Sequence, residues 1–76
     1  MKDLLTYIAK SLVEHPDAVN VTEVNRDDSL VLELRVSPDD MGKVIGKHGR
    51  IAKEIRSIIK AAALKDNIKV SVDIVD

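Results

Sequence analysis

Apolar residues occupy every second position of the segment 30–36, and this period of two constrains the fold more than any other feature of the chain. Every second residue from Leu30 to Val36 is apolar, whereas Glu33 and Arg35 occupy positions between them. This period of two predicts a β-strand with one buried face. Such a strand requires neighbouring strands and a layer that covers its apolar face, so the rest of the chain must supply both.

The segment before this strand predicts a helix and a second strand. Apolar residues at three- and four-residue spacing predict a helix over residues 3–14, ended by the proline that follows His15. Residues 19–26 predict a strand with imperfect alternation, because Val24 falls on the face opposite to Val21; a bulge would reconcile them. A turn at residues 27–29 would join the two strands into an antiparallel hairpin.

The segment after the strand predicts two helices and a last strand. Ser37, Pro38 and the two aspartates that follow favour a helix start, with Ser37 as the cap. This short helix stops at Gly46, a longer helix covers residues 50–64, and a strand covers residues 68–75. The order α-β-β-α-α-β predicts an α+β fold with three helices on one face of a three-stranded sheet. We expect one domain over residues 1–76, comprising an N-terminal helix (3–14) and a core (19–76).

The charge of the chain is nearly balanced but unevenly distributed. The formal net charge is −1, whereas residues 43–60 carry six basic side chains against the single acid Glu54. A protein polarised in this way steers a polyanion toward one face. With 76 residues and no cysteine, we expect one small core without disulfides or thiolate metal sites. No apolar run suits a signal peptide or a membrane segment, so the expected location is cytoplasmic.

Two glycines, Gly46 and Gly49, bracket Lys47 and His48 between the two helical patterns. Gly46 is suited to end the first helix in a left-handed conformation, and Gly49 lets a ligand approach the backbone closely. The second helix directs unpaired N–H groups and the positive end of its dipole at this loop. Lys47 and Arg50 add positive charge, and His48 adds a donor. The segment suits a phosphodiester, although a glycine pair is a weak signal alone and also fits a simple tight connection.

The run VIGKHGRIAKEIR, residues 44–56, resembles the signature of KH domains, in which an I-G-x-x-G loop joins two helices. KH domains clamp about four nucleotides of a nucleic-acid backbone with this loop. The predicted element order is similar to that of the bacterial, type II, KH fold. Over its whole length, including the lead-in Ser-Pro-Asp-Asp-Met-Gly, the chain resembles the small bacterial single-KH-domain RNA-binding proteins of the KhpA type.

The resemblance implies RNA-binding roles by position. The loop would contact phosphate, apolar residues beside it would form a groove floor, and basic residues would extend its rim. The implied RNA-binding residues are Lys43, Val44, Ile45, Gly46, Lys47, His48, Gly49, Arg50, Ile51 and Lys53. Residues 68–70 would form the opposite groove wall, and residues 64–67 a short variable loop. Because that loop is short and no aromatic residue lies near the motif, we expect weak and unspecific binding without base stacking.

The resemblance also implies partners and a role. Proteins of this type are linked to RNA chaperoning or post-transcriptional regulation, and to cell elongation, division and hence cell shape. They self-associate and pair with a larger KhpB (Jag)-type protein. The expected partners are therefore single-stranded RNA and a homodimer or such a heterodimer, with no cofactor, no metal and no enzymatic activity. The alternative is a protein-interaction module that acts mainly as a dimerisation partner of the KhpB-type protein.

Two other site types fit the sequence poorly. Residues 42–48 superficially resemble the phosphate loop of nucleotide hydrolases, but the glycine spacing is one residue short and His48 stands where Ser or Thr is required. His15 and His48 have no cysteine or second histidine at ligand spacing. His15 is therefore interpreted as a solvated helix-end residue and His48 as a loop donor.

The remaining polar features have structural interpretations. The acid pairs at residues 27–28 and 39–40 are assigned to a turn and to a helix start, since neither has a nucleophile or base beside it. Tyr7 is predicted to be a partly buried packing residue. The basic face of the last helix is by default solvated, although its continuity with the loop favours some contact with phosphate. That face consists of Lys53, Arg56 and Lys60.

Overall fold

The computed structural model of the protein describes residues 1–75. Its elements, in chain order, are α1 (Lys2–Leu12), β1 (Asn20–Arg26), β2 (Ser29–Arg35), α2 (Met41–Ile45), α3 (Arg50–Lys65) and β3 (Val70–Ile74). The predicted order α-β-β-α-α-β and the α+β class are confirmed. Short 3₁₀ turns precede β1, α2 and α3. Within residues 1–75, no helix has both the length and the apolar character needed to cross a bilayer.

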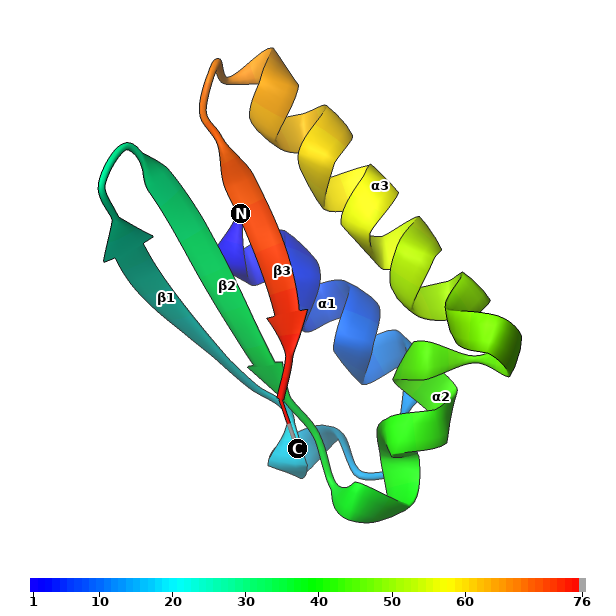
Figure 1. Ribbon diagram of the computed structural model, residues 1–76. Coiled ribbons are helices and arrows are strands. Elements are labelled where there is room, and N and C mark those ends of the chain that lie inside the picture. The colour runs from blue at the N-terminus through cyan, green and yellow to red at the C-terminus, as the bar shows by residue number, and fades with distance from the viewer. Residues whose placement is uncertain (76) are drawn as a thin grey trace.

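The sheet is mixed, with β2 in the centre (Figure 1). β1 pairs with β2 in antiparallel fashion and β3 pairs with it in parallel. The parallel pairing requires a crossover, which α2 and α3 supply. The β1–β2 register runs without interruption from Asn20↔Arg35 to Arg26↔Ser29, so the described strands contain no bulge. Val24 instead pairs with Val31 on the face away from the core.

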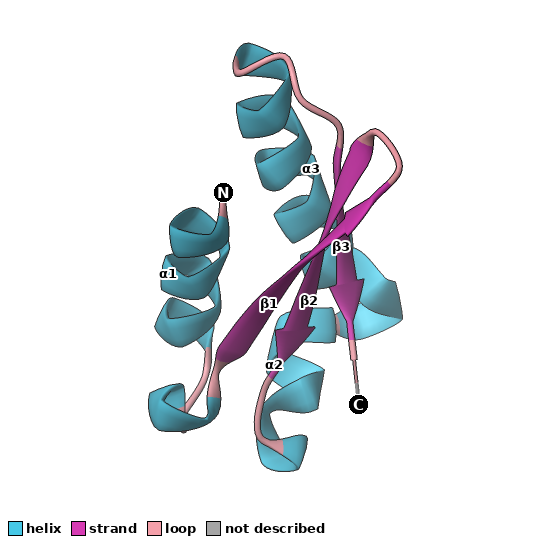
Figure 2. Ribbon diagram, turned by 90° about the vertical axis from the view of Figure 1, so that its left-hand side faces the viewer, coloured by secondary structure: helices cyan, strands magenta, loops and turns pink. Residues whose placement is uncertain are grey.

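The three helices pack against one face of the sheet and leave the other face open (Figure 2). Leu32 and Leu34 of β2 are fully buried on the covered face, as the alternation predicts. Aliphatic side chains from all three helices and all three strands close over them without any aromatic residue. The buried cluster consists of Leu5, Ala9, Val21, Leu32, Leu34, Val44, Ile55, Ile59 and Val72.

Two predicted boundaries are wrong by two residues. α1 ends at Leu12 and not at residue 14, because Val13 already has an extended conformation (φ −101°, ψ 161°). β3 begins at Val70 and not at residue 68. The N–H of Ile68 donates to the carbonyl of Ala63 and so completes the end of α3. Ile68 is therefore 45% exposed and does not belong to the apolar face of the strand.

Two predictions for single side chains are also wrong. Ser37 does not cap a helix through its side chain; its carbonyl accepts the N–H of Asp40 at 2.8 Å in the 3₁₀ turn Pro38–Asp40. Tyr7 is 72% exposed rather than partly buried. Tyr7 lies two residues after the buried Leu5, and a step of about 200° around a helix reaches the opposite face.

We expect Leu34→Ala to lower the free energy of unfolding by about 2–5 kcal/mol, since it empties a fully buried site. Leu64→Ala makes the same change at a side chain that is 80% exposed. It should alter the free energy of unfolding by less than about 0.5 kcal/mol. Urea unfolding followed by circular dichroism measures both values. Equal losses in the two variants would contradict the placement of the core.

Candidate nucleic-acid interface

The loop between α2 and α3 is a chain of unusual backbone conformations. α2 ends at Ile45, and Gly46 follows with φ 75° and ψ 176°, a region that only glycine occupies readily. His48 and Gly49 are both left-handed, with φ of 57° and 72°. These turns redirect the chain within four residues, so that α3 starts at Arg50 (Figure 1). The path of the backbone through this loop therefore depends on its two glycines.

The two glycines serve different purposes. A Cβ atom on Gly46 would lie 2.6 Å from Cγ1 of Ile51, so the first turn of α3 packs directly on this residue. A Cβ atom on Gly49 would meet no protein atom within 4 Å and would project into open space. Gly46 is thus required by packing and backbone, whereas Gly49 leaves an uncovered stretch of backbone at the start of α3. A ligand can approach that stretch closely.

Most of the residues that the resemblance assigned to RNA surround this loop at the surface. The loop side chains Lys47 and His48 are exposed. Arg50 and Lys53 are exposed on the first turns of α3. The apolar residues beside the loop are Ile45, which is 37% exposed, and the half-buried Ile51.

Two assigned residues differ from this group. Val44 is 0% exposed and belongs to the core, so the prediction that it lines an RNA-binding surface is wrong. The apolar period of α2 places Val44 inward, and no surface is left for a ligand to touch. Lys43 is partly exposed, but its ammonium lies near the carboxylates of Asp40 and Glu14 and already has partners within the protein.

A furrow runs between α3 and the free edge of β3. The part nearer the α3–β3 connection is a hollow of about 370 Å³ with mostly apolar walls. A smaller hollow of about 210 Å³ continues the furrow toward the middle of α3. Lys60 and Val70 line both hollows, so the two are continuous. The furrow is lined by Arg56, Lys60, Ala63, Leu64, Ile68, Lys69, Val70, Ser71 and Val72. The expected wall at residues 68–70 thus lies opposite α3.

Arg56 is a furrow residue that the sequence interpretation placed on a basic face, solvated by default but favoured for some contact with phosphate, and not in the furrow. Its Nε donates to the carbonyl of Val72 at 3.2 Å, so the side chain lies across the furrow and reaches β3. The helical period holds a signal for this position: Arg56 lies three residues before the buried Ile59 and four after the buried Ala52. It therefore borders the buried face of α3 instead of opposing it.

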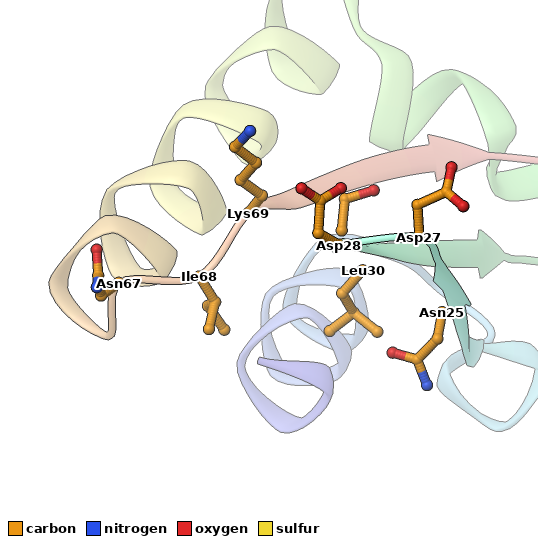
Figure 3. Close-up of a pocket in the computed structure, with 8 residues that line it drawn as sticks. Asn25, Asp27, Asp28, Leu30, Asn67, Ile68 and Lys69 are labelled. Atoms are coloured by element: carbon orange, nitrogen blue, oxygen red, sulfur yellow. The ribbon is translucent and has the colours of Figure 1, made fainter.

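A separate open hollow of about 450 Å³ lies between the β1–β2 turn and the α3–β3 connection (Figure 3). These two connections lie at the end of the molecule away from the glycine loop (Figure 1). Asp27 and Asp28 line it together with Lys69. Asp27 has φ 52°, as expected for a turn residue, which supports the turn interpretation of this acid pair. The two acidic side chains that line this hollow do not suit the binding of phosphate, and we assign the hollow no part in the interface.

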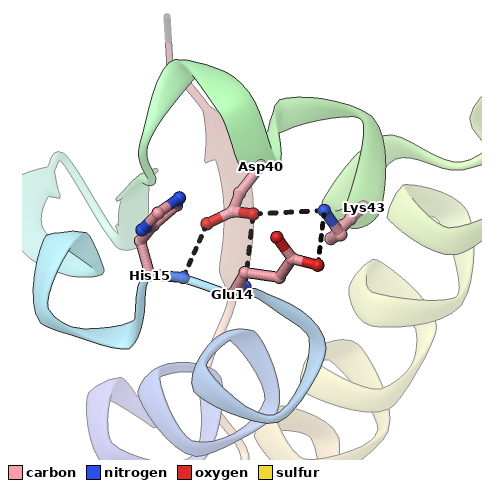
Figure 4. Close-up of polar contacts among 4 residues, drawn as sticks. All are labelled: Glu14, His15, Asp40 and Lys43. Atoms are coloured by element: carbon pink, nitrogen blue, oxygen red, sulfur yellow. Dashed lines mark hydrogen bonds and ion pairs between the residues drawn. The ribbon is translucent and has the colours of Figure 1, made fainter.

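Asp40 is the one charged side chain that is fully buried among the described residues. Its carboxylate accepts the backbone N–H groups of Glu14 at 3.2 Å and His15 at 2.9 Å (Figure 4). Lys43 Nζ lies 3.5 Å from Asp40 Oδ1 and 3.8 Å from Glu14 Oε1. We call these four residues the clasp, because they join the chain after α1 to the start of α2. The sequence gives no local signal for it, since Asp40 is 25 residues from His15.

The environment of Asp40 lowers the pKa of its carboxyl below its ordinary value. Burial by itself raises this pKa, but the N–H groups of Glu14 and His15 and the ammonium of Lys43 stabilise the ionised form, and the charge of His15 adds to them. The net effect is a carboxylate that remains ionised under ordinary conditions. Its negative charge is balanced inside the protein by two N–H groups and the ammonium of Lys43.

The clasp also contains three groups with metal-binding chemistry. One ligand atom each from Glu14, His15 and Asp40 lie within 4.8 Å of one another. The ammonium of Lys43, however, pairs with both carboxylates. The cluster therefore carries its own cation, and a metal ion would have to displace it.

Comparison with known proteins agrees with this geometry. Residues 2–74 match the family described as "KhpA/KhpB, KH domain". The chain belongs to the KhpA/KhpB KH-domain family. It is 61% identical over 75 residues to "RNA-binding protein KhpA" of Clostridium perfringens, covering 99% of this chain and 100% of that protein. It is 55% identical to the KhpA of Halalkalibacterium halodurans over the full length of both chains. The predicted family and the single KH fold are thus confirmed.

Solved structures show the same KH fold within a larger protein. Aquifex aeolicus Era bound to GDP and aluminium fluoride matches 96% of this chain and 28% of its own, with 22% identity and a TM-score of 0.66. Era in complex with MgGDPNP and nucleotides 1506–1542 of 16S ribosomal RNA matches with a TM-score of 0.61, again at 22% identity. At this identity the likeness establishes the shared fold alone.

We expect Gly46→Ala to destabilise the KH domain by roughly 1–3 kcal/mol, because φ is positive and the new methyl group would collide with Ile51. Gly42→Ala is the matched control. Gly42 lies inside α2, where an added Cβ meets nothing within 4 Å, so alanine should stabilise by up to about 1 kcal/mol. Chemical unfolding of both variants tests this. A loss at residue 42 as large as that at residue 46 would contradict the loop geometry.

The clasp predicts a specific acid sensitivity. A carboxyl whose pKa is lower in the folded than in the unfolded state stabilises the fold above its unfolded pKa, about 3.9 for Asp. That stabilisation is lost as the pH falls through the folded pKa. We therefore expect the wild type to lose more stability between pH 6 and pH 3 than Asp40→Asn, which lacks this titration. Urea unfolding at several pH values measures the difference; parallel pH profiles would contradict it.

Proposed function

We propose that this protein binds single-stranded RNA by gripping the phosphate backbone at the loop Gly46–Gly49. The observation that carries the proposal is the uncovered, sharply turned glycine loop at the start of α3, surrounded by exposed basic side chains. The names of its relatives support the ligand, since proteins up to 63% identical over 75 residues are called RNA-binding protein KhpA. The proposed contacts are Ile45, Gly46, Lys47, His48, Gly49, Arg50, Ile51 and Lys53.

The physical basis of the proposed grip is the set of donors and positive charges at the start of α3. The N–H groups of Gly49 and Arg50 already donate to the carbonyls of Gly46 and Lys47. The N–H groups that follow in the first turn of α3 have no side-chain cap and are the donors offered to a phosphate. The positive end of the helix dipole adds to their attraction for phosphate. Lys47 and Arg50 contribute full charges from both sides of Gly49. A phosphate at this point would satisfy these groups together.

The furrow between α3 and β3 would receive the bases. Near the α3–β3 connection its walls are mostly apolar and are formed by Ala63, Leu64, Ile68 and Val70. No aromatic side chain lines it, so bases would be held by apolar packing and hydrogen bonds and not by stacking. We therefore propose weak binding with little base preference for a single domain.

Association with a second KH domain would compensate for weak binding, because linked sites gain effective concentration. We propose a homodimer, or a heterodimer with a KhpB (Jag)-type protein, acting in the cytoplasm as an RNA chaperone or post-transcriptional regulator linked to cell elongation and division. Exposed apolar residues outside the furrow favour such a contact: Ile58 of α3 is 48% and Leu12 of α1 37% exposed. We propose a binding role and no enzymatic one.

The same exposed residues favour the second candidate, a protein-interaction module that acts mainly as the smaller half of a complex. The two candidates differ in their dependence on the glycine loop. RNA binding requires the charge of Lys47 and the hydrogen-bond donor of His48, whereas a purely protein-protein role does not.

We expect Lys47→Asp combined with His48→Asp to abolish RNA binding and leave the fold intact, because both side chains are exposed. Fluorescence polarisation with a labelled short single-stranded RNA, from low to physiological salt, measures the affinity. For the wild type, log affinity should fall against log salt with a slope of about −0.7 per phosphate contact. A circular dichroism melt reports whether the variant is folded.

The control is Lys2→Asp combined with Asn25→Asp, which changes the formal charge equally at exposed positions away from the loop. This control should retain most of the affinity. Equal losses in the two variants would mean that net charge, and not the loop, governs binding. Normal binding by the loop variant would refute the loop assignment, and absence of wild-type binding at low salt would favour the protein-interaction role.

A further inference from the structure

α2 cannot determine its own orientation. It has only five residues, far fewer than an isolated helix needs for stability. Its direction depends on what holds it: Val44 is buried in the core, and Asp40 anchors the end where the helix begins. The other end leads directly into Gly46, roughly 7.5 Å further along the axis. Asp40 and the glycine loop thus lie at the two ends of one short helix.

The clasp holds α2 to backbone groups that have no other described partner. α1 has ended at Leu12, so the N–H groups of Glu14 and His15 lie beyond the helical hydrogen-bond pattern. Asp40 accepts both. Lys43, one turn along α2, then pairs with Asp40 and bridges to Glu14. The contacts thus tie two successive turns of the chain before the loop to the end of α1.

We propose that Asp40 and Lys43 are positioning residues, which set the placement of the glycine loop by fastening α2 to the end of α1. The consequence for RNA rests on the proposed function. In this role Lys43 acts through Asp40 and does not touch phosphate, although its charge and its closeness to the loop suggest an RNA contact. Its ammonium lies between two carboxylates, and moving it to a phosphate would leave the buried charge of Asp40 with one partner fewer.

The first test compares Lys43→Met with Lys47→Met, identical substitutions four residues apart that each remove one positive charge. Lys47→Met should weaken RNA binding and reduce the salt slope by about 0.7, because a phosphate contact is lost. Lys43→Met should weaken binding by roughly tenfold, the effect of one charge-assisted hydrogen bond, with the slope unchanged. Lys43→Arg should restore the affinity, since a guanidinium can pair with both carboxylates.

The second test needs no RNA. In ¹⁵N-labelled free protein, the amide resonances of Gly46 and Gly49 should shift in Lys43→Met and in Asp40→Asn. Lys65→Met is the control, because it removes an exposed lysine at the far end of α3. It should leave both glycine resonances in place. Unchanged glycine resonances in Lys43→Met would overturn the positioning role, whether or not Asp40→Asn folds.

The sign of the Asp40→Asn effect separates positioning from long-range electrostatics. Loss of a negative charge alone would strengthen RNA binding, whereas a displaced loop weakens it, and we expect the weaker binding.

A salt slope that falls in Lys43→Met as in Lys47→Met would show direct phosphate contact and overturn the proposal. If Lys43→Met and Asp40→Asn lower the melting temperature but leave the affinity for RNA unchanged, the clasp only stabilises the fold and the positioning role is overturned. If the wild type binds no RNA, the proposed function fails, while the glycine resonances still decide the positioning role.

Discussion

Burial of one face of β2 is the constraint on which the rest of the structure depends. Leu32 and Leu34 lie at the centre of the sheet and are fully covered. Because β2 has a partner on each side, its hydrogen bonds are satisfied within the sheet, and the helices need only supply apolar cover. The buried cluster is small and aliphatic throughout, so the helices must pack closely on the sheet to exclude water from it. This packing places α2 and α3 at fixed angles and so creates the turn between them.

The glycine loop is the point where this packing is joined to surface chemistry. Gly46 is pressed against Ile51, and that contact ties the loop to the first turn of α3. Gly49, three residues later, has no side chain and faces open space. One glycine therefore serves the fold and the other leaves room for a ligand. The basic side chains around the loop would add little without this exposed backbone, because charges on a solvated helix face bind phosphate without defining its position.

The sequence predicted the elements well and their ends less well. Periodicity identified the three strands and the two longer helices, because apolar burial follows the period of each element. The short helix α2 was predicted from the start signals at residues 37–40 and the stop at Gly46. It misplaced Ile68 in the last strand, since the hydrogen bond from its N–H to Ala63 extends the end of α3 instead. It expected Tyr7 to be partly buried and Val44 to line a surface. These errors concern which side of an element is covered, a property that depends on neighbours distant in the chain.

The sequence by itself determined the α-β-β-α-α-β order, the glycine loop and the local excess of positive charge, because each depends on residues close together in the chain. Only the tertiary structure decided what Asp40, Lys43 and Arg56 do. Asp40 and Lys43 meet the chain after α1, and Arg56 reaches across to Val72 of β3. A charged residue in a helical pattern is equally compatible with solvent, ligand or an internal partner. The choice among these is made by segments that folding brings together, and local pattern carries no information about them.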